Sequence, residues 1–436
     1  MKQTLVTLVL AYLRFFAKIA LIIHKPTTIG IAGSVGKSST RNALEAILRN
    51  KKTKVVSQNS ETGIPLGILA IKIDDYGLFS WLKAILLAPF KIFSTKGFDY
   101  MIVEMGIDDP FPPKNMEYLL TIVNPDVAIS LNISATHTMQ FAKLLPKKPK
   151  DKKDYEFLLE KIAEEDTKII TKSGARLGIY DKDNKYIHSI LKDFDKGELL
   201  TFGKDKNNTI YFDKYAVDPN GTMFSFILEG QAIKINLKGL VLPLEYREVL
   251  APAILTAYKL GINIEEITDS LQNNYKLPKG RASIFKGINK SIILDSSYNS
   301  SKLAVIAFLN LATSLSKTEK RKVAFLMGDM RELGDLAEKE HKEIANLINE
   351  TVDYLYCVGP LTKEYVLPNV KVKEALWFQN SKEAGEYLAK NLPKDVILVV
   401  KGSQNGIFLE EAIKPLLLNK EDEKKLPRQE KYWQKN

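Results

Sequence analysis

A glycine-rich loop between a strand-type run and a helix-type run is the first sign of chemistry in this sequence. Residues 28–32 are apolar and strand-like, residues 33–40 read GSVGKSST, and residues 41–49 repeat apolar side chains with a helical period. Such an order of strand, loop and helix directs backbone N–H groups and a helix N-terminus towards phosphate oxygens. The sequence therefore predicts a phosphate-binding loop of the short G-x-x-G-K-S form.

Each residue type in this loop has a physical reason to be there. Gly33 and Gly36 permit close approach of the backbone to a ligand. Lys37 is placed to reach the outer phosphates, and the Ser38 hydroxyl is placed to bind Mg²⁺. A chance glycine turn before a helix is the alternative, and the Gly-Lys-Ser-Ser run in this context argues against it.

Polar side chains at the ends of two further apolar runs are candidates for the same site. One run covers residues 100–104 and ends at Glu104, and the other covers residues 126–132, ends at Asn132 and is followed by His137. Parallel α/β sheets bind ligands at the carboxyl ends of their strands, so we expect a shared site. A strand-end acid near a phosphate loop is suited to hold Mg²⁺. A solvated acid and an exposed loop histidine would give the same pattern.

The elements that position these residues alternate between strand and helix, which predicts an α/β fold with a mainly parallel sheet covered by helices. We expect four segments: an amphipathic helix over residues 1–26, an ATP-binding domain over 27–281, a second α/β domain over 282–418, and a disordered charged tail over 419–436.

Composition limits the classes of function. The chain has 436 residues, with 63 Lys and Arg against 52 Asp and Glu, a net charge of +11. A single cysteine and four histidines argue against a disulfide framework and a multi-cysteine zinc site, and they fit a reducing, cytoplasmic compartment. Only the net charge favours a nucleic-acid partner, and we see no aromatic-and-basic RNA motif, so we expect none.

Two apolar segments raise the question of a membrane. Residues 5–23 are largely apolar, but Arg14 and Lys18 interrupt them, so we expect an amphipathic helix. It either packs on its own domain or contacts the inner membrane surface through residues 4–25. The aromatic-rich run over residues 78–90 has helical period and is either a core helix or a second helix that faces the membrane or the substrate.

Eight segments, in chain order, resemble signatures of the Mur ligase family, the ATP-dependent amide-forming ligases of cell-wall precursor synthesis. They most resemble the branch that adds D-alanyl-D-alanine to the UDP-muramoyl tripeptide. The segments span roughly residues 28 to 415. They are residues 33–39, 59–66, 103–106, 132–137, 278–281, 295–301, 328–334 followed by His341, and 401–403.

This resemblance implies a P-loop central domain with a mainly parallel sheet and a Rossmann-like α/β C-terminal domain. It also implies ATP and Mg²⁺ as cofactors, and a peptidoglycan precursor and an amino acid or dipeptide as substrates. ATP would phosphorylate a carboxylate of the precursor, and the amine of the incoming residue would attack the acyl phosphate.

Site residues follow from the matched motifs. The resemblance implies catalytic roles for Lys37, Glu104, His137 and Asp166, and metal binding by Ser38, Glu104, His137 and Asp166. It implies nucleotide contacts by Gly33, Ser34, Val35, Gly36, Lys37, Ser38, Ser39, Asn132, Arg281, Asp295 and Asn299.

Three departures from the family pattern matter. The phosphate loop begins near residue 30, so we expect no N-terminal UDP-sugar domain. Asp166 stands where many members carry a carbamylated lysine; it either replaces that metal ligand or is a surface acid on a charged helix. The segment over residues 245–249 lacks the asparagines found near the adenine.

These departures leave two alternatives open. The chain could act on a lipid-linked precursor as an amidating subunit, although Cys357 is its only cysteine and that family carries a cysteine-rich zinc ribbon. It could also be a nucleotide-binding module without ligase activity. The retained motif residues argue against the second alternative.

Overall fold

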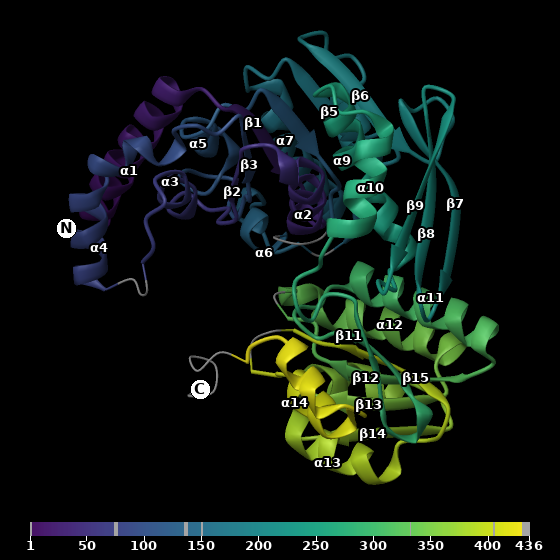
Figure 1. The fold of residues 1–436 in the computed structure, drawn as a ribbon. Helices are drawn as coiled ribbons and strands as arrows, with labels where there is room; N and C mark the ends of the chain where they lie inside the picture. Colours follow the sequence, from purple (N-terminus) through teal and green to yellow (C-terminus); the bar gives the residue numbers. More distant parts are fainter. Residues whose placement is uncertain are drawn as a thin grey trace. The chain divides into compact units, whose positions relative to one another are not determined.

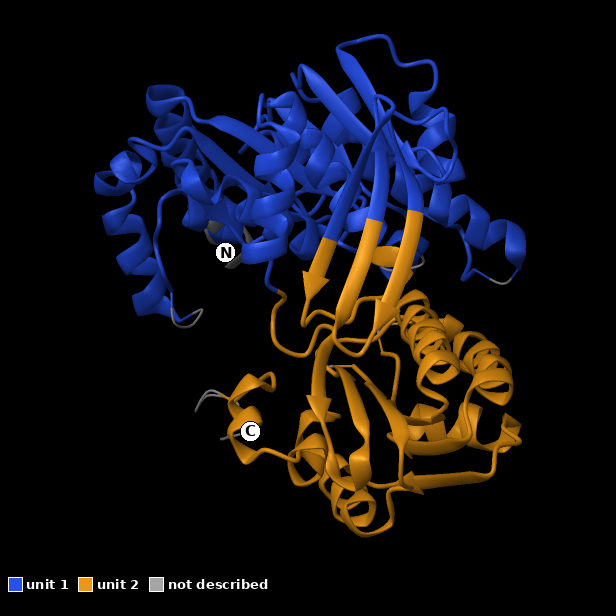
Figure 2. Ribbon diagram, turned by 45° about the vertical axis from the view of Figure 1, so that its right-hand side comes forward, with its two compact units in different colours: residues 1–213, 225–235, 247–276 blue, residues 214–224, 236–246, 277–436 orange. Residues whose placement is uncertain are grey.

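The computed structural model describes residues 2–73, 77–134, 138–149, 151–331, 333–403 and 406–429. The chain forms two compact units (Figure 2). Unit 1 comprises residues 1–213, 225–235 and 247–276, and unit 2 comprises residues 214–224, 236–246 and 277–436. Strands β7 (Ile210–Asp218), β8 (Gly221–Leu228) and β9 (Gln231–Lys238) run through the division. The domain boundaries stay a prediction.

The larger sheet has the strand order β2-β3-β1-β4-β5-β6-β7-β8-β9 (Figure 1). From β2 to β6 every neighbouring pair is parallel, as expected. The strands are buried and rich in apolar residues because helices cover a parallel sheet on both faces. Their bounds are β1 Thr27–Ala32, β2 Thr53–Val56, β3 Tyr100–Glu104, β4 Val127–Ser130, β5 Leu177–Asp181 and β6 Glu198–Gly203.

Several helices in unit 1 begin at local capping signals. The Asp151 side chain accepts from the Asp154 amide before α7, and Asn263 accepts from Glu266 before α10, which satisfies N–H groups at each helix start. The helices are α1 Lys2–His24, α2 Lys37–Ile47, α3 Gly63–Ile68, α4 Leu78–Leu87, α5 Met116–Leu120, α6 Thr138–Phe141, α7 Lys152–Thr171, α8 Lys185–Leu191, α9 Arg247–Lys259 and α10 Ile264–Asn274, with a 3₁₀ helix, η2, over Phe90–Thr95.

Helix α1 is part of the core of unit 1. Leu10, Leu13, Ala17 and Ala20 recur every three or four residues and are buried. The Arg14 guanidinium donates to Thr121 Oγ1 at 3.0 Å, so this basic residue faces its own unit. By length and apolar composition alone, residues 6–24 also meet the criteria for a membrane-crossing helix, which buried core helices and signal sequences meet as well.

Unit 2 contains a second sheet with the order β10-β11-β15-β12-β13-β14, in which the β10–β11 pairing is antiparallel and the others are parallel. The Rossmann-like α/β prediction is thereby confirmed. The elements are β10 Ser283–Lys286, β11 Ile292–Ser296, α11 Lys302–Glu319, β12 Lys322–Gly328, α12 Ala337–Thr351, β13 Tyr354–Val358, β14 Glu374–Phe378, α13 Ser381–Asn391, β15 Val396–Lys401 and α14 Glu410–Ile413.

The charged C-terminal segment is ordered as far as it is described, in contrast to the disorder expected from residue 419. Lys420–Lys425 forms a 3₁₀ helix, and Leu426 is fully buried. Arg428 forms a buried ion pair with Glu410 at 2.5 Å and donates to the Ser297 carbonyl at 3.1 Å. These two side chains, rather than the composition of the whole segment, decide its structure. Residues 430–436 lie outside the described residues.

We expect Arg428→Met to lower the free energy of unfolding by about 3–5 kcal/mol, because it leaves the Glu410 carboxylate buried without a cation. Urea unfolding of the full chain measures this change. The double variant Glu410→Gln/Arg428→Met removes both charges and should recover a large part of the loss. A double variant whose loss equals the sum of the two single losses would contradict the coupling.

Candidate nucleotide-binding site

The loop between β1 and α2 has the backbone geometry of a phosphate site. Gly33 and Gly36 have φ of +134° and +96°, values that favour glycine. A Cβ at Gly33 would lie 2.9 Å from Leu131 Cβ, so a larger residue would displace the neighbouring segment. Helix α2 begins at Lys37, and among the described residues no side chain caps its N-terminus. Its first N–H groups and the helix dipole therefore favour an anion.

Residues after β4 hold this loop in place. The Ser34 amide donates to the Asn132 carbonyl at 2.8 Å, and the Val35 amide donates to Asn132 Oδ1 at 3.0 Å. The Ser34 hydroxyl in turn accepts from the Ser134 amide at 3.0 Å. Asn132 thus lies beside the phosphate loop, as its motif implied, and its observed bonds position the loop. Its contact with a nucleotide stays a prediction.

Asp166 lies beside the same loop. Its side chain is only 2% exposed, so the alternative that it is a surface acid on α7 is wrong. Burial raises the pKa of this carboxyl group to about 7, and the charge of Lys37 and the Gly33 backbone amide oppose that rise. Lys37 Nζ itself donates to the Gly33 carbonyl. The structure therefore brings Gly33, Lys37 and Asp166 together.

Glu104 comes from the end of β3 and meets two residues of α2. Its side chain is 3% exposed, and its Oε2 accepts from the Ser38 hydroxyl at 3.0 Å. Its other oxygen forms a 2.5 Å ion pair with Arg41. The sequence reasoning named Ser38 and Glu104 but missed Arg41. The available signal was spacing, because a residue three positions after Ser38 shares its helix face.

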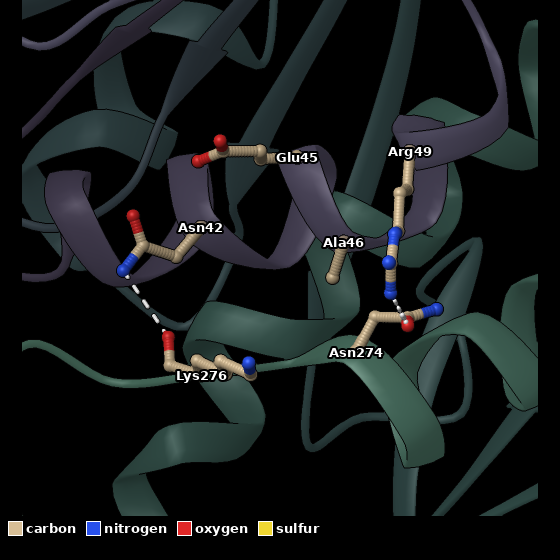
Figure 3. A pocket seen from close by; sticks show the side chains of 6 residues that line it. All are labelled: Asn42, Glu45, Ala46, Arg49, Asn274 and Lys276. Atoms are coloured by element: carbon tan, nitrogen blue, oxygen red, sulfur yellow. Dashed lines mark hydrogen bonds between the residues drawn. The ribbon is translucent and has the colours of Figure 1, made fainter.

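A chain of two hydrogen bonds links Arg41, through the side-chain amide of Asn42, to the last residue of unit 1. Arg41 Nη2 donates to Asn42 Oδ1 at 2.7 Å, and Asn42 Nδ2 donates to the Lys276 carbonyl at 3.2 Å. Figure 3 shows the latter bond at a surface pocket of about 340 Å³. The loop residues do not line this pocket, so it is separate from the phosphate site. Its lining residues are Asn42, Glu45, Ala46, Arg49, Asn274 and Lys276.

The oxygen atoms of Ser38 and Glu104 suit Mg²⁺, which prefers hard oxygen ligands. Among the described residues, no group of three or more His, Cys, Asp or Glu side chains could hold a metal. Two protein oxygens are nevertheless enough where substrate phosphates and waters complete the shell, as is usual for Mg²⁺. His137 lies outside the described residues, so its metal role stays a prediction.

Helix α9 packs against the loop at the segment expected near the adenine. A Cβ at Gly36 would lie 3.6 Å from Val249 Cγ2. Arg247, at the start of α9, lies over the Phe212 ring at 4.5 Å, and its buried Nε has no hydrogen-bond partner among the described residues. A buried donor without a partner is costly, so Arg247 is an additional candidate for a nucleotide contact. Sequence reasoning recorded only the missing asparagines here.

The remaining predicted nucleotide residues lie together in unit 2. The Arg281 guanidinium lies 5.1 Å from the centre of the Tyr298 ring. Lys401 Nζ donates to the carbonyls of Ser296, at 3.1 Å, and Asn299. Burial, with the nearby charge of Arg281, lowers the pKa of Lys401 to about 7.

Asp295 is buried in the same cluster. Its Oδ1 accepts from the Ser297 amide at 2.9 Å, and its Oδ2 has no partner among the described residues. Burial raises its pKa to about 6, and Ser297 and Lys401 oppose that rise. The predicted residues Arg281, Asp295 and Asn299 thus form one cluster with Lys401.

Comparisons with known proteins agree with this architecture. Residues 280–404 match the family model described as Mur ligase, glutamate ligase domain. The chain is 25% identical over 398 residues to the UDP-N-acetylmuramoyl-tripeptide--D-alanyl-D-alanine ligase of Buchnera aphidicola, covering 89% of this chain and 75% of that protein. It is 24% identical over 400 residues to the Bacillus subtilis enzyme of the same name, with the same coverage of 89% and 75%. The chain is thus similar to Mur ligases over most of its length.

Solved structures of Mur ligases have the same fold as this chain. MurF from Acinetobacter baumannii superposes with a TM-score of 0.71 at 19% identity, covering 93% of this chain and 79% of that one. MurF ligase from Thermotoga maritima in complex with ADP has a TM-score of 0.71 at 19% identity, covering 95% and 84%. The predicted resemblance to Mur ligases, and to the D-alanyl-D-alanine-adding branch, is confirmed. The individual site residues stay predictions.

We expect Arg41→Met to tighten Mg²⁺ binding in the presence of ADP by about fivefold, because it removes a cation that competes for Glu104. Calorimetric titration of the ADP-loaded protein with Mg²⁺ measures this change. Arg49→Met alters another arginine beside α2, whose partner is Asn274, and should leave Mg²⁺ binding unchanged. Weaker Mg²⁺ binding in Arg41→Met would show instead that Arg41 positions Glu104 for the metal.

We expect Asp166→Asn to weaken ADP binding by about tenfold both with Mg²⁺ and with a chelator present, because Asp166 stabilises Lys37 and the Gly33 amide. Titration under the two conditions distinguishes this role from metal binding. A loss confined to the Mg²⁺ condition would assign Asp166 as a metal ligand. Glu164→Gln, an exposed change on the same helix, is the control.

Proposed function

We propose that this chain is an ATP-dependent ligase of peptidoglycan precursor synthesis, which joins D-alanyl-D-alanine to the terminal carboxylate of a muramoyl tripeptide. The proposal rests on the phosphate loop, where the Ser38 hydroxyl lies 3.0 Å from Glu104 Oε2. The chain also aligns over 89% of its length with ligases of that name. Alignment and site geometry are independent arguments, and both favour phosphoryl chemistry.

The chemistry needs two steps. The precursor carboxylate attacks the γ-phosphorus of ATP, which forms an acyl phosphate and releases ADP. The amine of D-alanyl-D-alanine then attacks the acyl carbon, the bond to phosphate breaks, and the amine loses a proton. Positioning and charge neutralisation supply most of the catalysis in such transfers.

The residues of unit 1 suit the first step. Lys37 Nζ donates to the Gly33 carbonyl, so its ammonium group lies at the phosphate loop. There it would neutralise the charge of an incoming phosphate. Ser38 and Glu104 would hold Mg²⁺, which when bound neutralises the phosphate oxygens. We propose that Asp166 supports the loop beside them, and that His137 contributes to the metal site as its motif implies.

The residues of unit 2 suit recognition of the nucleotide. We propose contacts by Arg281, Asp295 and Asn299, which lie in one cluster with Lys401. Because burial lowers the pKa of Lys401 to about 7, its charge depends on what occupies the cluster. An incoming phosphate would favour the protonated form.

We place the enzyme in the cytoplasm, where ATP is available, and propose that residues 4–25 contact the inner membrane surface. The outward residues of α1 support that contact, since Leu8, Phe15 and Ile22 are all exposed. A membrane-proximal position would be compatible with either a UDP-linked or a lipid-linked precursor.

Phosphate release from Mg²⁺ATP tests the ligase directly. We expect release only when UDP-muramoyl tripeptide and D-alanyl-D-alanine are both present, and a loss of at least about a hundredfold in Lys37→Met, because the transferring phosphoryl group loses a neutralising charge. Lys52→Met, an exposed lysine of the same unit, should retain activity.

A parallel reaction with lipid-linked muramoyl tripeptide in detergent decides between the two donors. Release with that donor alone would change the proposed substrate. No release with either donor, despite ADP binding, would contradict the ligase.

A further inference from the structure

The outward face of α1 is apolar although the helix packs on unit 1 through its other face. Leu8, Phe15 and Ile22 recur every seven residues and therefore share one face, and each is more than half exposed. Ile23, beside them, is also exposed. Leu10, Leu13, Ala17 and Ala20 face the core, so large apolar side chains lie on both faces of this helix.

Helices α4 and η2 repeat this pattern. Ala84 and Ala88 are fully buried, whereas Phe79 and Phe90 are 86% and 79% exposed. This contradicts the alternative that residues 78–90 form an ordinary core helix, in which large apolar side chains would be inside. The exposed large residues lie mostly at helical spacing; they are Leu78, Phe79, Leu82, Leu86, Phe90 and Phe93.

These helices contact one another, and both belong to unit 1. The Tyr12 hydroxyl of α1 donates to the Ile85 carbonyl of α4 at 3.1 Å, and Thr95 Oγ1 donates to the Ala20 carbonyl at 3.2 Å. The His24 and Phe93 rings are 6.0 Å apart. Figure 1 shows α4 alongside α1 at the edge of unit 1. We call the exposed residues of α1, α4 and η2 the apolar platform.

The two segments that form the apolar platform carry charge of one sign. Residues 1–25 contain four basic residues and no acidic one, and residues 77–98 contain three basic residues and no acidic one. Lys18, Lys25, Lys83 and Lys96 are exposed. Lysines at the border of an exposed apolar helix face are typical of helices that lie in the surface of an anionic bilayer.

We propose that the apolar platform binds the surface of an anionic lipid bilayer, with its leucine and phenylalanine side chains among the acyl chains and its lysines at the headgroups. Contiguous apolar patches of this kind are rare on soluble monomers and mark interaction sites. A spanning orientation of α1 would remove Leu13, Ala17 and Ala20 from the core cluster of unit 1, so the helix lies along the surface. This inference does not depend on the ligase activity.

Vesicle flotation of the full chain tests the proposal. We expect the protein to float with vesicles that contain phosphatidylglycerol, and much less with pure phosphatidylcholine vesicles. Phe79→Glu/Phe90→Glu should lower binding by about tenfold or more, because two exposed apolar groups become charged. Leu418→Glu changes an exposed apolar residue of unit 2, and this variant should bind as the wild type does.

A second variant tests the contribution of the lysines separately from that of the apolar side chains. Lys18→Gln/Lys83→Gln should weaken binding to the anionic vesicles and reduce its dependence on salt. Deletion of residues 1–25 is unsuitable, because it removes core side chains. All variants change exposed residues, and their thermal unfolding midpoints should match the wild type.

Three outcomes would overturn the proposal. The first is a wild type that does not float with the anionic vesicles. The second is a Phe79→Glu/Phe90→Glu variant that floats equally well. The third is a wild type that is dimeric and does not float while this variant is monomeric, because a second copy of the chain would then cover the platform.

Discussion

The buried carboxylate of Glu104 is the charge around which the nucleotide site of unit 1 is arranged. A desolvated carboxylate needs cations or donors, and it has both in Arg41 and the Ser38 hydroxyl. Sheet register brings them together, because Glu104 on β3 pairs with Ile31 near the end of β1, from which the loop leads into α2. The Glu104 carboxylate thus links the end of β3 to the first turns of α2, the helix that follows the phosphate loop.

Arg41 also connects Glu104 to the last residue of unit 1. The same guanidinium that neutralises Glu104 donates to Asn42, which donates to the carbonyl of Lys276, the last residue of unit 1 before the chain continues into unit 2. A ligand that takes over Glu104 would compete with Arg41 for that carboxylate. The hydrogen-bonded chain therefore ties the carboxylate proposed to hold Mg²⁺ to the end of unit 1.

Local patterns predicted the site better than they predicted its surroundings. The phosphate loop, the parallel strands and the position of Glu104 follow from runs of adjacent residues, which fix secondary structure and strand ends. Arg41 and the burial of Asp166 depend on which helix face meets the loop. The order of the tail depends on the burial of Leu426 and on Arg428, whose partners Glu410 and Ser297 lie 18 and 131 positions away in the sequence. Charged composition alone could not reveal such contacts.

Helix α1 is connected closely to the phosphate loop, in sequence and through the core of unit 1. Only Lys25 and Pro26 separate the end of α1 from β1, and β1 leads directly into the phosphate loop. Leu13 and Ala17 of α1 share a core cluster with Ala32, the last residue of β1. Because close-packed interiors transmit displacement rather than absorb it, a displacement of α1 would be passed on to the end of β1. Any surface that holds the outer face of α1 therefore also orients the strand end at which the phosphates would bind.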